Sequence, residues 1–301
     1  MSKPAPLPED TGTVTALVDP APRALIGSQP PARSAALITS AVIGVPVSFV
    51  LVSLAASTTF AGNTVAISVT TGLIIILYSL IARHYIQHYL RSHLTASTDE
   101  RDQSADVLGV HHPQATTVLV VALALLTGWY TAQLAGAIAY GYFGSPGFDA
   151  HTETITSPPL WQMALVAIVM APISEELLLR GVAYPLLRTR CSVWISIAAT
   201  TVVFGIIHAN LVQFIATMPL AIIAALIYEH TRHLGYAIGA HMLFNVLSLV
   251  MPVAVVNVVG AAGMPVTIAV AIITAVLTTW LMLQARNLHA ITPDGEQQPA
   301  M

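Results

Sequence analysis

Residues 160–184 read LWQMALVAIVMAPISEELLLRGVAY, a long apolar run with charged residues inside it. Its length suits a membrane crossing, which takes about 20 predominantly apolar residues in a helix. Yet Glu175, Glu176 and Arg180 stand in its interior. Each charged side chain in a membrane helix costs about 2.5–3.5 kcal/mol on insertion scales, so such residues usually face other helices and mark a functional site. The stretch therefore predicts a membrane helix whose charged face is enclosed by a bundle.

The composition of the whole chain agrees with a membrane protein. Of its 301 residues 55% are hydrophobic and only 8% are charged, and the mean hydropathy is +0.76. A soluble domain carries about 25% charged residues, so the outer surface of this chain has to face lipid. The net charge of -3 offers no basic face for nucleic acid. The single cysteine, Cys191, excludes an internal disulfide and a multi-cysteine metal cluster, and we interpret it as incidental.

Apolar runs of similar length recur along the chain, which predicts an all-α, polytopic membrane protein with eight helices in one bundle. The predicted spans are 35–57, 63–82, 115–143, 160–184, 193–209, 211–228, 234–250 and 265–285. The glycine- and proline-containing region 251–264 is predicted to be a connector. We predict a disordered proline-rich tail at 1–34, a membrane domain at 35–286 and a second disordered tail at 287–301.

The positions of Lys and Arg predict the orientation. If the N-terminus lies inside, every basic residue except Arg180 falls in a cytoplasmic segment. The outer connections, 58–62, 144–159, 209–210 and 251–264, then contain none, as the positive-inside rule requires. We therefore expect an integral membrane protein with both termini in the cytoplasm. The Ala-, Val- and Thr-rich composition favours a bacterial plasma membrane.

The three charged residues of 160–184 divide into a pair and a single carboxylate. Glu176 and Arg180 are spaced i,i+4, so they share a helical face and can neutralise each other. Glu175 is displaced by about 100° and has no partner at a local spacing. A carboxylate of this kind suits a general base. The alternative is that all three side chains form one packing network with no chemical role.

Two other spans carry polar i,i+4 pairs. Phe204 and His208 end the fifth span, and His241 and Asn245 lie in the seventh. With a rise of about 1.5 Å per residue, Glu175 and His241 lie about 15 Å and 14 Å from the inner ends of their helices, whereas His208 lies about 22 Å away. The three helices can therefore present these groups at comparable depth, with His208 about a turn higher.

Glu175-Glu176-x-x-x-Arg180, Phe204-x-x-x-His208 and His241-x-x-x-Asn245 together resemble the three-motif signature of the CAAX prenyl protease 2 family. These intramembrane proteases are also called the CPBP or Abi family. The resemblance covers about 160–250, which it implies is the protease core. It implies an endopeptidase built on an eight-helix body, with a cavity open to the cytoplasm.

The resemblance also implies a role for each motif residue. Glu175 would activate a water molecule with help from His208, and His241 and Asn245 would line an oxyanion hole. The supporting residues would be Glu176, Arg180 and Phe204. The implied partners are the bilayer and a peptide or membrane-anchored protein substrate. Peptide hydrolysis needs a base, an oxyanion donor and an acid, which these side chains can supply.

We expect no metal cofactor, because the chain lacks His-Glu-x-x-His and a zinc site would still need a separate base. The alternative is a zinc ion held by Glu175, His208 and His241, with one open position. A second cluster of histidines starts at His84 and His88 and continues with His93, His111 and His112. We interpret its first part as an amphipathic helix at the membrane surface and a zinc site there as the weaker alternative.

Two other functions fit the sequence. The chain could be a non-catalytic adaptor or immunity protein that keeps the motifs but acts by binding. A small-molecule transporter would also concentrate ionisable groups in the membrane, but no inverted repeat is evident. We interpret Glu229, His230, Arg232 and His233 as a solvated cytoplasmic turn, with a role in substrate entry as the alternative.

Overall fold

The computed structural model describes residues 36, 39–94, 115–144, 146–188, 191–251 and 263–289. Within these ranges the chain forms helices and no β-strand, so the prediction of an all-α, polytopic membrane protein is confirmed. The predicted tail at 1–34 and most of the tail at 287–301 lie outside the described residues. The last helix ends at His289, three residues beyond the predicted boundary of the membrane domain.

Residues 160–184 lie in one continuous helical run over Leu160–Arg188. It consists of α7 (Leu160–Ala164), η4 (Leu165–Met170), α8 (Ala171–Leu178), η5 (Leu179–Ala183) and α9 (Tyr184–Arg188). The η segments are π-helical, with hydrogen bonds from residue i to i+5. Such segments occur frequently at functional sites. Here they stand on both sides of α8, which carries the two glutamates.

The remaining predicted spans are also helical. In chain order the elements are η3 (Ser40–Gly44) with α2 (Val45–Thr59), α3 (Thr64–Leu94), α5 (Ala115–Phe143), α6 (Pro146–Thr156), α10 (Val193–Ile207), α11 (Leu211–Thr231), α12 (Leu234–Val250) and α14 (Met264–His289). Within the described part of the chain, five runs are long and apolar enough to cross a membrane by length and composition: Ser40–Thr59, Thr64–His88, Val118–Phe143, Leu160–Arg188 and Leu211–Thr231. The other three predicted spans contain shorter apolar helices, Val193–Ile207, Leu234–Val250 and Ile268–Trp280.

Two connections differ from the prediction. α3 continues without a break to Leu94, twelve residues beyond the predicted end at 82, so His84 and His88 belong to the span's own helix. No glycine or proline interrupts residues 83–94, which explains the continuation. The predicted outer connection 144–159 contains α6, which begins at Pro146 and has Asp149 in its first turn. Both features favour a helix start, but a search for long apolar runs does not detect so polar a helix.

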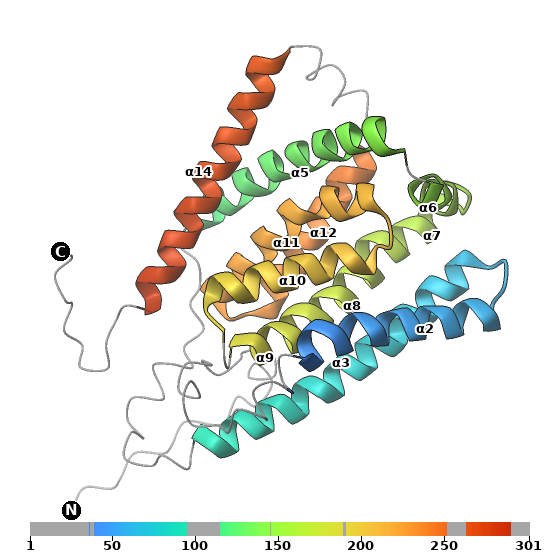
Figure 1. The fold of residues 1–301 in the computed structure, drawn as a ribbon, viewed down its shortest axis with the longest axis horizontal. Coiled ribbons are helices and arrows are strands. Elements are labelled where there is room, and N and C mark those ends of the chain that lie inside the picture. Colours follow the sequence, from blue (N-terminus) through green and yellow to red (C-terminus); the bar gives the residue numbers. More distant parts are fainter. Residues whose placement is uncertain are drawn as a thin grey trace, which may run out of the picture.

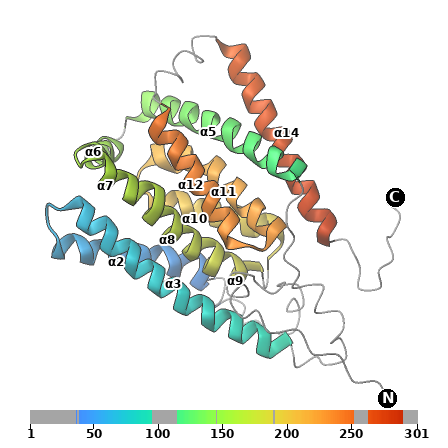
Figure 2. The same ribbon diagram turned by 180° about the vertical axis from the view of Figure 1, so that it is seen from behind.

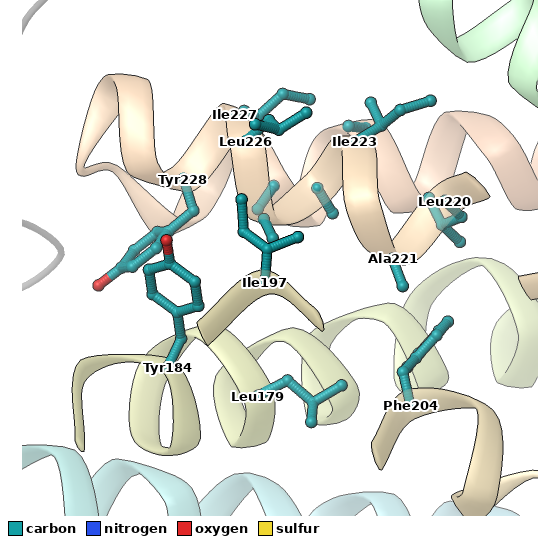
Figure 3. Packing of buried hydrophobic residues seen from close by; sticks show 14 of the residues in the cluster. Leu179, Tyr184, Ile197, Phe204, Leu220, Ala221, Ile223, Leu226, Ile227 and Tyr228 are labelled. Carbon is teal, nitrogen blue, oxygen red and sulfur yellow. The ribbon is translucent and has the colours of Figure 1, made fainter. Parts of the chain in front are cut away.

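The helices form a bundle with α11 at its centre. Figures 1 and 2 show α2 and α3 along one edge, α5 and α14 along the opposite edge, and α8, α10, α11 and α12 between them. In the apolar stretch of α11 half of the residues are buried, against 17% in that of the first span, Ser40–Thr59. This difference places α11 in the core. Figure 3 shows Leu226 and Ile227 of α11 above Ile197 and Leu179 from the neighbouring helices. Small residues let helix backbones approach closely in membranes, and α11 buries Ala221, Ala224 and Ala225.

Two tight turns position the helices that carry the histidines. Between α10 and α11, Ala209 adopts a left-handed conformation with φ of 56°. Asn210 then caps α11 by accepting a hydrogen bond from the backbone N–H of Gln213 at 2.8 Å. Between α11 and α12, Arg232 is also left-handed, with φ of 54°. The three helices are therefore sequential antiparallel neighbours, and α10 and α12 both contact the central α11.

Candidate active site

The predicted pair of Glu176 and Arg180 is present and fully enclosed. Arg180 Nη1 donates to Glu176 Oε1 at 3.0 Å, and both side chains are 0% exposed. Arg180 Nη2 also donates to the backbone carbonyl of Ala221 on α11. A buried charge is tolerated when it is paired and hydrogen-bonded. The guanidinium therefore compensates Glu176 and ties α8 and η5 to the central helix.

His241 of α12 makes a contact with Glu176 that the sequence did not predict. Its Nδ1 lies 2.9 Å from Glu176 Oε1, and the imidazole is buried. An ionised carboxylate can only accept a hydrogen bond, so Nδ1 carries the proton in this arrangement. Glu176 thereby fixes the tautomer and the ring orientation of His241. Because 65 positions separate the two residues, no local spacing could have signalled the contact.

Glu175, predicted to have no local partner, faces His241 from across the helix interface. Its Oε2 lies 3.8 Å from His241 Nε2, and its side chain is 12% exposed. That separation is too long for a direct hydrogen bond, and it is a separation at which a bridging water is to be considered. His241 thus presents one ring nitrogen to each of the two consecutive glutamates.

Phe204 contacts side chains from all three motifs. Its ring is 1% exposed, and it meets the rings of His208 and His241 edge-on at centroid distances of 5.0 Å and 5.6 Å. The guanidinium carbon of Arg180 lies 5.8 Å from the Phe204 centroid, within the range of a cation–π contact. The aromatic residue, predicted as a supporting member of the site, therefore brings residues of η5, α10 and α12 together.

His208 stands at the end of α10, where it is half-buried. Its Nδ1 lies 2.8 Å from the carbonyl oxygen of Phe204. A carbonyl only accepts, so Nδ1 is protonated and Nε2 is left as an acceptor. Among the described residues no ion pair joins His208 to a carboxylate. The ring contacts therefore connect His208 to His241 through Phe204, and His241 in turn faces Glu175.

Asn245 lies one turn beyond His241 on α12. Its Nδ2 donates to the carbonyl of Ala167 in η4 at 2.7 Å. This contact connects α12 to the π-helical segment that precedes the glutamates. A carboxamide has two N–H donors, so one remains for another acceptor. The role of Asn245 in an oxyanion hole stays a prediction.

The described residues hold no cluster of three or more His, Cys, Asp or Glu side chains arranged to bind a metal ion. The alternative zinc ligands Glu175, His208 and His241 therefore do not form a three-ligand set in this arrangement. His84 and His88 do not form one with any other described residue, and His111 and His112 lie outside the described ranges. The expectation that the site needs no metal stays a prediction.

A second buried ionic cluster surrounds Glu229, near the C-terminal end of α11. This carboxylate is 1% exposed and accepts hydrogen bonds from the Tyr184 hydroxyl at 2.8 Å, Arg188 at 3.2 Å and Arg232 at 2.9 Å. The prediction of a solvated turn is therefore wrong for Glu229. The turn folds back against α9, whose Arg188 and Tyr184 supply the donors that make burial of the carboxylate tolerable.

Comparison with known proteins gives a family match, which falls on the region of the three motifs. Residues 157–247 match the family model described as "Type II CAAX prenyl endopeptidase Rce1-like". This range contains all three motifs, from Glu175 to Asn245. The resemblance predicted from the motifs is therefore confirmed. No solved structure matches the chain.

Two curated bacterial proteins are similar to part of the chain. The protein named "Putative membrane peptidase YdiL" of Bacillus subtilis (strain 168) is 28% identical over 122 residues, which are 39% of this chain and 49% of that protein. The protein named "UPF0177 protein YbdJ" of Lactococcus lactis subsp. lactis (strain IL1403) is 26% identical over 95 residues, 31% of this chain and 41% of the relative. The chain thus spans half or less of the length of the curated relatives it matches.

Proposed function

We propose that the chain is an intramembrane endopeptidase of the Rce1-like type, in which Glu175 activates a water molecule. The match of residues 157–247 to the model of type II CAAX prenyl endopeptidases supports this proposal. The observation that carries the proposal is the placement of His241 between two consecutive glutamates. One carboxylate fixes the ring, and the other is left 3.8 Å away.

Glu175 acts as the general base. It is the less buried of the two glutamates, with 12% of its side chain exposed against 0% for Glu176. Arg180 and His241 both bind Glu176, so we assign that carboxylate to holding these two side chains and not to taking a proton from water. A general base has to lie within hydrogen-bond reach of the proton it takes, directly or through one water. A water between Glu175 and His241 meets this requirement.

The reaction is an addition followed by an elimination. Glu175 takes one proton from the water while the water oxygen bonds to the carbonyl carbon of the scissile peptide. The carbonyl oxygen becomes an oxyanion, which accepts a hydrogen bond from the second N–H of Asn245. The imidazole of His241 adds a second donor in its doubly protonated form, in which Nε2 as well as Nδ1 carries a proton. The carbon–nitrogen bond then breaks, and the leaving amine receives the proton that Glu175 accepted. The products are a carboxylic acid and an amine, which exchange one proton to leave a carboxylate and an ammonium ion.

His208 assists by accepting a hydrogen bond. Its Nδ1 proton is directed to the Phe204 carbonyl, so the lone pair of Nε2 is available. In the resting arrangement His208 has ring contact with Phe204, not with a carboxylate. We assign it to orienting the water or the substrate backbone as the substrate enters. The substrate is a peptide or a membrane-anchored protein, and the chain is oriented with both termini in the cytoplasm.

Support for this orientation comes from one end of the bundle. Arg188 and Arg232 both bind Glu229 there, although they belong to different turns of the chain. Arg83 of α3 lies beside Gly181 of the same helical run as Arg188. These arginines are among those that the positive-inside rule places in the cytoplasm.

The test compares the membrane proteomes of three bacterial strains. One carries the wild-type chain, one the Glu175→Gln variant and one no copy of the gene. We expect the variant and the deletion strain to accumulate the same uncut membrane proteins, and the variant to be present at wild-type abundance. Glu153→Gln, on the exposed surface of α6, is the matched control and should cleave normally. Wild-type cleavage and complementation by Glu175→Gln would overturn the proposal in favour of an adaptor that acts by binding.

A further inference from the structure

Three polar residues form a stripe on α12, and each contacts a different segment. His241, Asn245 and Ser248 are spaced i, i+4 and i+7, so their side chains fall within roughly 60° of one another around the helix. His241 binds Glu176 of α8, and Asn245 binds the carbonyl of Ala167 in η4. Ser248 binds α5, which the family match does not include.

The contact of Ser248 with α5 is made by Trp129. The indole Nε1 donates to Ser248 Oγ at 3.0 Å, and the Trp129 side chain is almost fully buried, at 2% exposed. Ser248 Oγ in turn donates to the Phe244 carbonyl at 3.1 Å. Gln133, one turn along α5, also reaches Ser248 Oγ, at 3.4 Å. The hydroxyl thus uses its one proton and accepts from α5, and the indole N–H has its partner.

We propose that Trp129 and Ser248 form a clasp that sets the position of α12 and thereby holds His241 between Glu175 and Glu176. Trp129 is then a positioning residue for the reaction, contributed by a helix outside residues 157–247. The functional consequence rests on the proposed peptidase function. The effect of the clasp on the position of the His241 imidazole does not depend on that function.

The position of α12 matters because the His241 contacts are unequal. Its Nδ1 is at hydrogen-bond distance from Glu176, while its Nε2 stands 3.8 Å from Glu175. Ser248 lies two turns from His241, about 10.5 Å along a rigid helix. A shift or rotation of α12 at Ser248 is therefore carried to the imidazole. Misplacement of a catalytic group by about 1 Å can cost about 100-fold in rate.

Substitutions can separate the contribution of the Trp129 ring from that of its N–H group. Trp129→Phe keeps a buried aromatic ring and removes the donor, and Ser248→Ala removes the acceptor. Ser248→Thr keeps the hydroxyl. The matched control is Thr131→Val on the same helix, because Thr131 contacts Thr274 of α14 at 3.4 Å and makes no hydrogen bond to α12.

The test is histidine ring NMR on the full-length chain in nanodiscs, with ¹⁵N-labelled histidine and His241 assigned by its loss in His241→Gln. We expect Trp129→Phe and Ser248→Ala to shift the His241 ring signals in the same direction, and the double variant to shift them no further. Ser248→Thr and Thr131→Val should match the wild type. Unchanged His241 signals in both Trp129→Phe and Ser248→Ala would overturn the clasp.

Cleavage of a substrate found in the proteome comparison gives the second readout. We expect kcat to fall about 10-fold or more in Trp129→Phe and Ser248→Ala with KM unchanged, and Ser248→Thr to restore it. An equal loss of folded protein and activity, with the specific activity unchanged, would overturn the positioning role. If instead Glu175→Gln cleaves normally, the peptidase proposal fails, while the NMR result still decides the clasp.

Discussion

His241 Nδ1 lies 2.9 Å from Oε1 of Glu176, although 65 positions separate the two residues in the chain. The same carboxylate oxygen accepts from Arg180. One atom of α8 therefore connects η5 with α12, and Arg180 extends the connection to the α11 backbone. Glu176, which directly follows the proposed base Glu175, therefore joins the helices of the site.

The first prediction concerns this junction. Arg180→Ala leaves the Glu176 carboxylate buried without its guanidinium and should destabilise the folded chain by about 3–5 kcal/mol, the range for breaking a buried ion pair. Thermal unfolding in detergent measures the loss. Replacing both partners by similar-sized uncharged side chains, in Glu176→Gln with Arg180→Met, should cost less than Arg180→Ala. An Arg180→Ala variant as stable as the wild type would contradict the structural role of the pair.

The second prediction uses two glycines of the site helices. A Cβ built on Gly205 would lie 2.5 Å from Cδ2 of the Phe214 ring, whereas a Cβ on Gly239 would meet nothing within 4 Å. Gly205→Ala should therefore push α11 away from α10 and cost about 1–3 kcal/mol, as overpacking does. Gly239→Ala should be neutral or stabilising, because alanine favours a helix. Thermal unfolding of both variants checks this, and equal stabilities would contradict the close approach.

The third prediction concerns the ionic cluster at Glu229. Glu229→Gln removes the negative charge and leaves Arg188 and Arg232 facing a neutral amide in a buried place. We expect a loss of stability of about 2–4 kcal/mol, less than for an outright truncation because the amide oxygen still accepts hydrogen bonds. The exposed Glu153→Gln is the control and should change stability little. If the two variants unfold at the same temperature, the cluster does not support the fold.

The fourth prediction concerns the reactivity of Cys191, which lies between α9 and α10. Burial raises the pKa of its thiol above the ordinary value, and the nearby Arg188 guanidinium only partly offsets this. Since the thiolate is the reactive form, iodoacetamide at pH 8 should label Cys191 more slowly than free cysteine. The labelling rate should continue to rise above pH 9. Labelling at the rate of free cysteine, or as fast as in the SDS-unfolded chain, would contradict the prediction.

The fifth prediction concerns metal dependence. Because the described histidines and glutamates do not form a three-ligand set, we expect protein dialysed against a strong chelator to keep its cleavage rate within about twofold. The assay uses a substrate identified by the proteome comparison, with chelated and untreated protein measured side by side. Loss of activity that zinc restores would return Glu175, His208 and His241 to the role of ligands.

Features encoded over short distances in the chain could be predicted from the sequence. The runs of apolar residues predicted the spans, because a bilayer fixes the length of a crossing helix. The i,i+4 spacing predicted the Glu176–Arg180 pair, which the structure confirms. The helix α6 was missed, since its start is marked by Pro146 and Asp149 and not by an apolar run.

Contacts that depend on how helices rotate against each other could not be predicted. Glu176 and His241 meet only because α8 and α12 turn particular faces together, and the 119 positions between Trp129 and Ser248 contain no signal for their contact. The burial of Glu229 likewise depends on the turn at Arg232 folding against α9. Each depends on packing across the bundle, which hydrophobic periodicity leaves undetermined.

The π-helical segments on either side of α8 determine which way its carboxylates point. A segment such as η4 holds one more residue in its hydrogen-bonded loop than the α-helix does. If the same residues between 165 and 170 wound as a regular α-helix, every side chain after them would turn by about 100° relative to those before. Glu175 would then no longer face α12. The direction in which Glu175 points is thus set by the winding of residues 165–170 as well as by the identity of the residue at position 175.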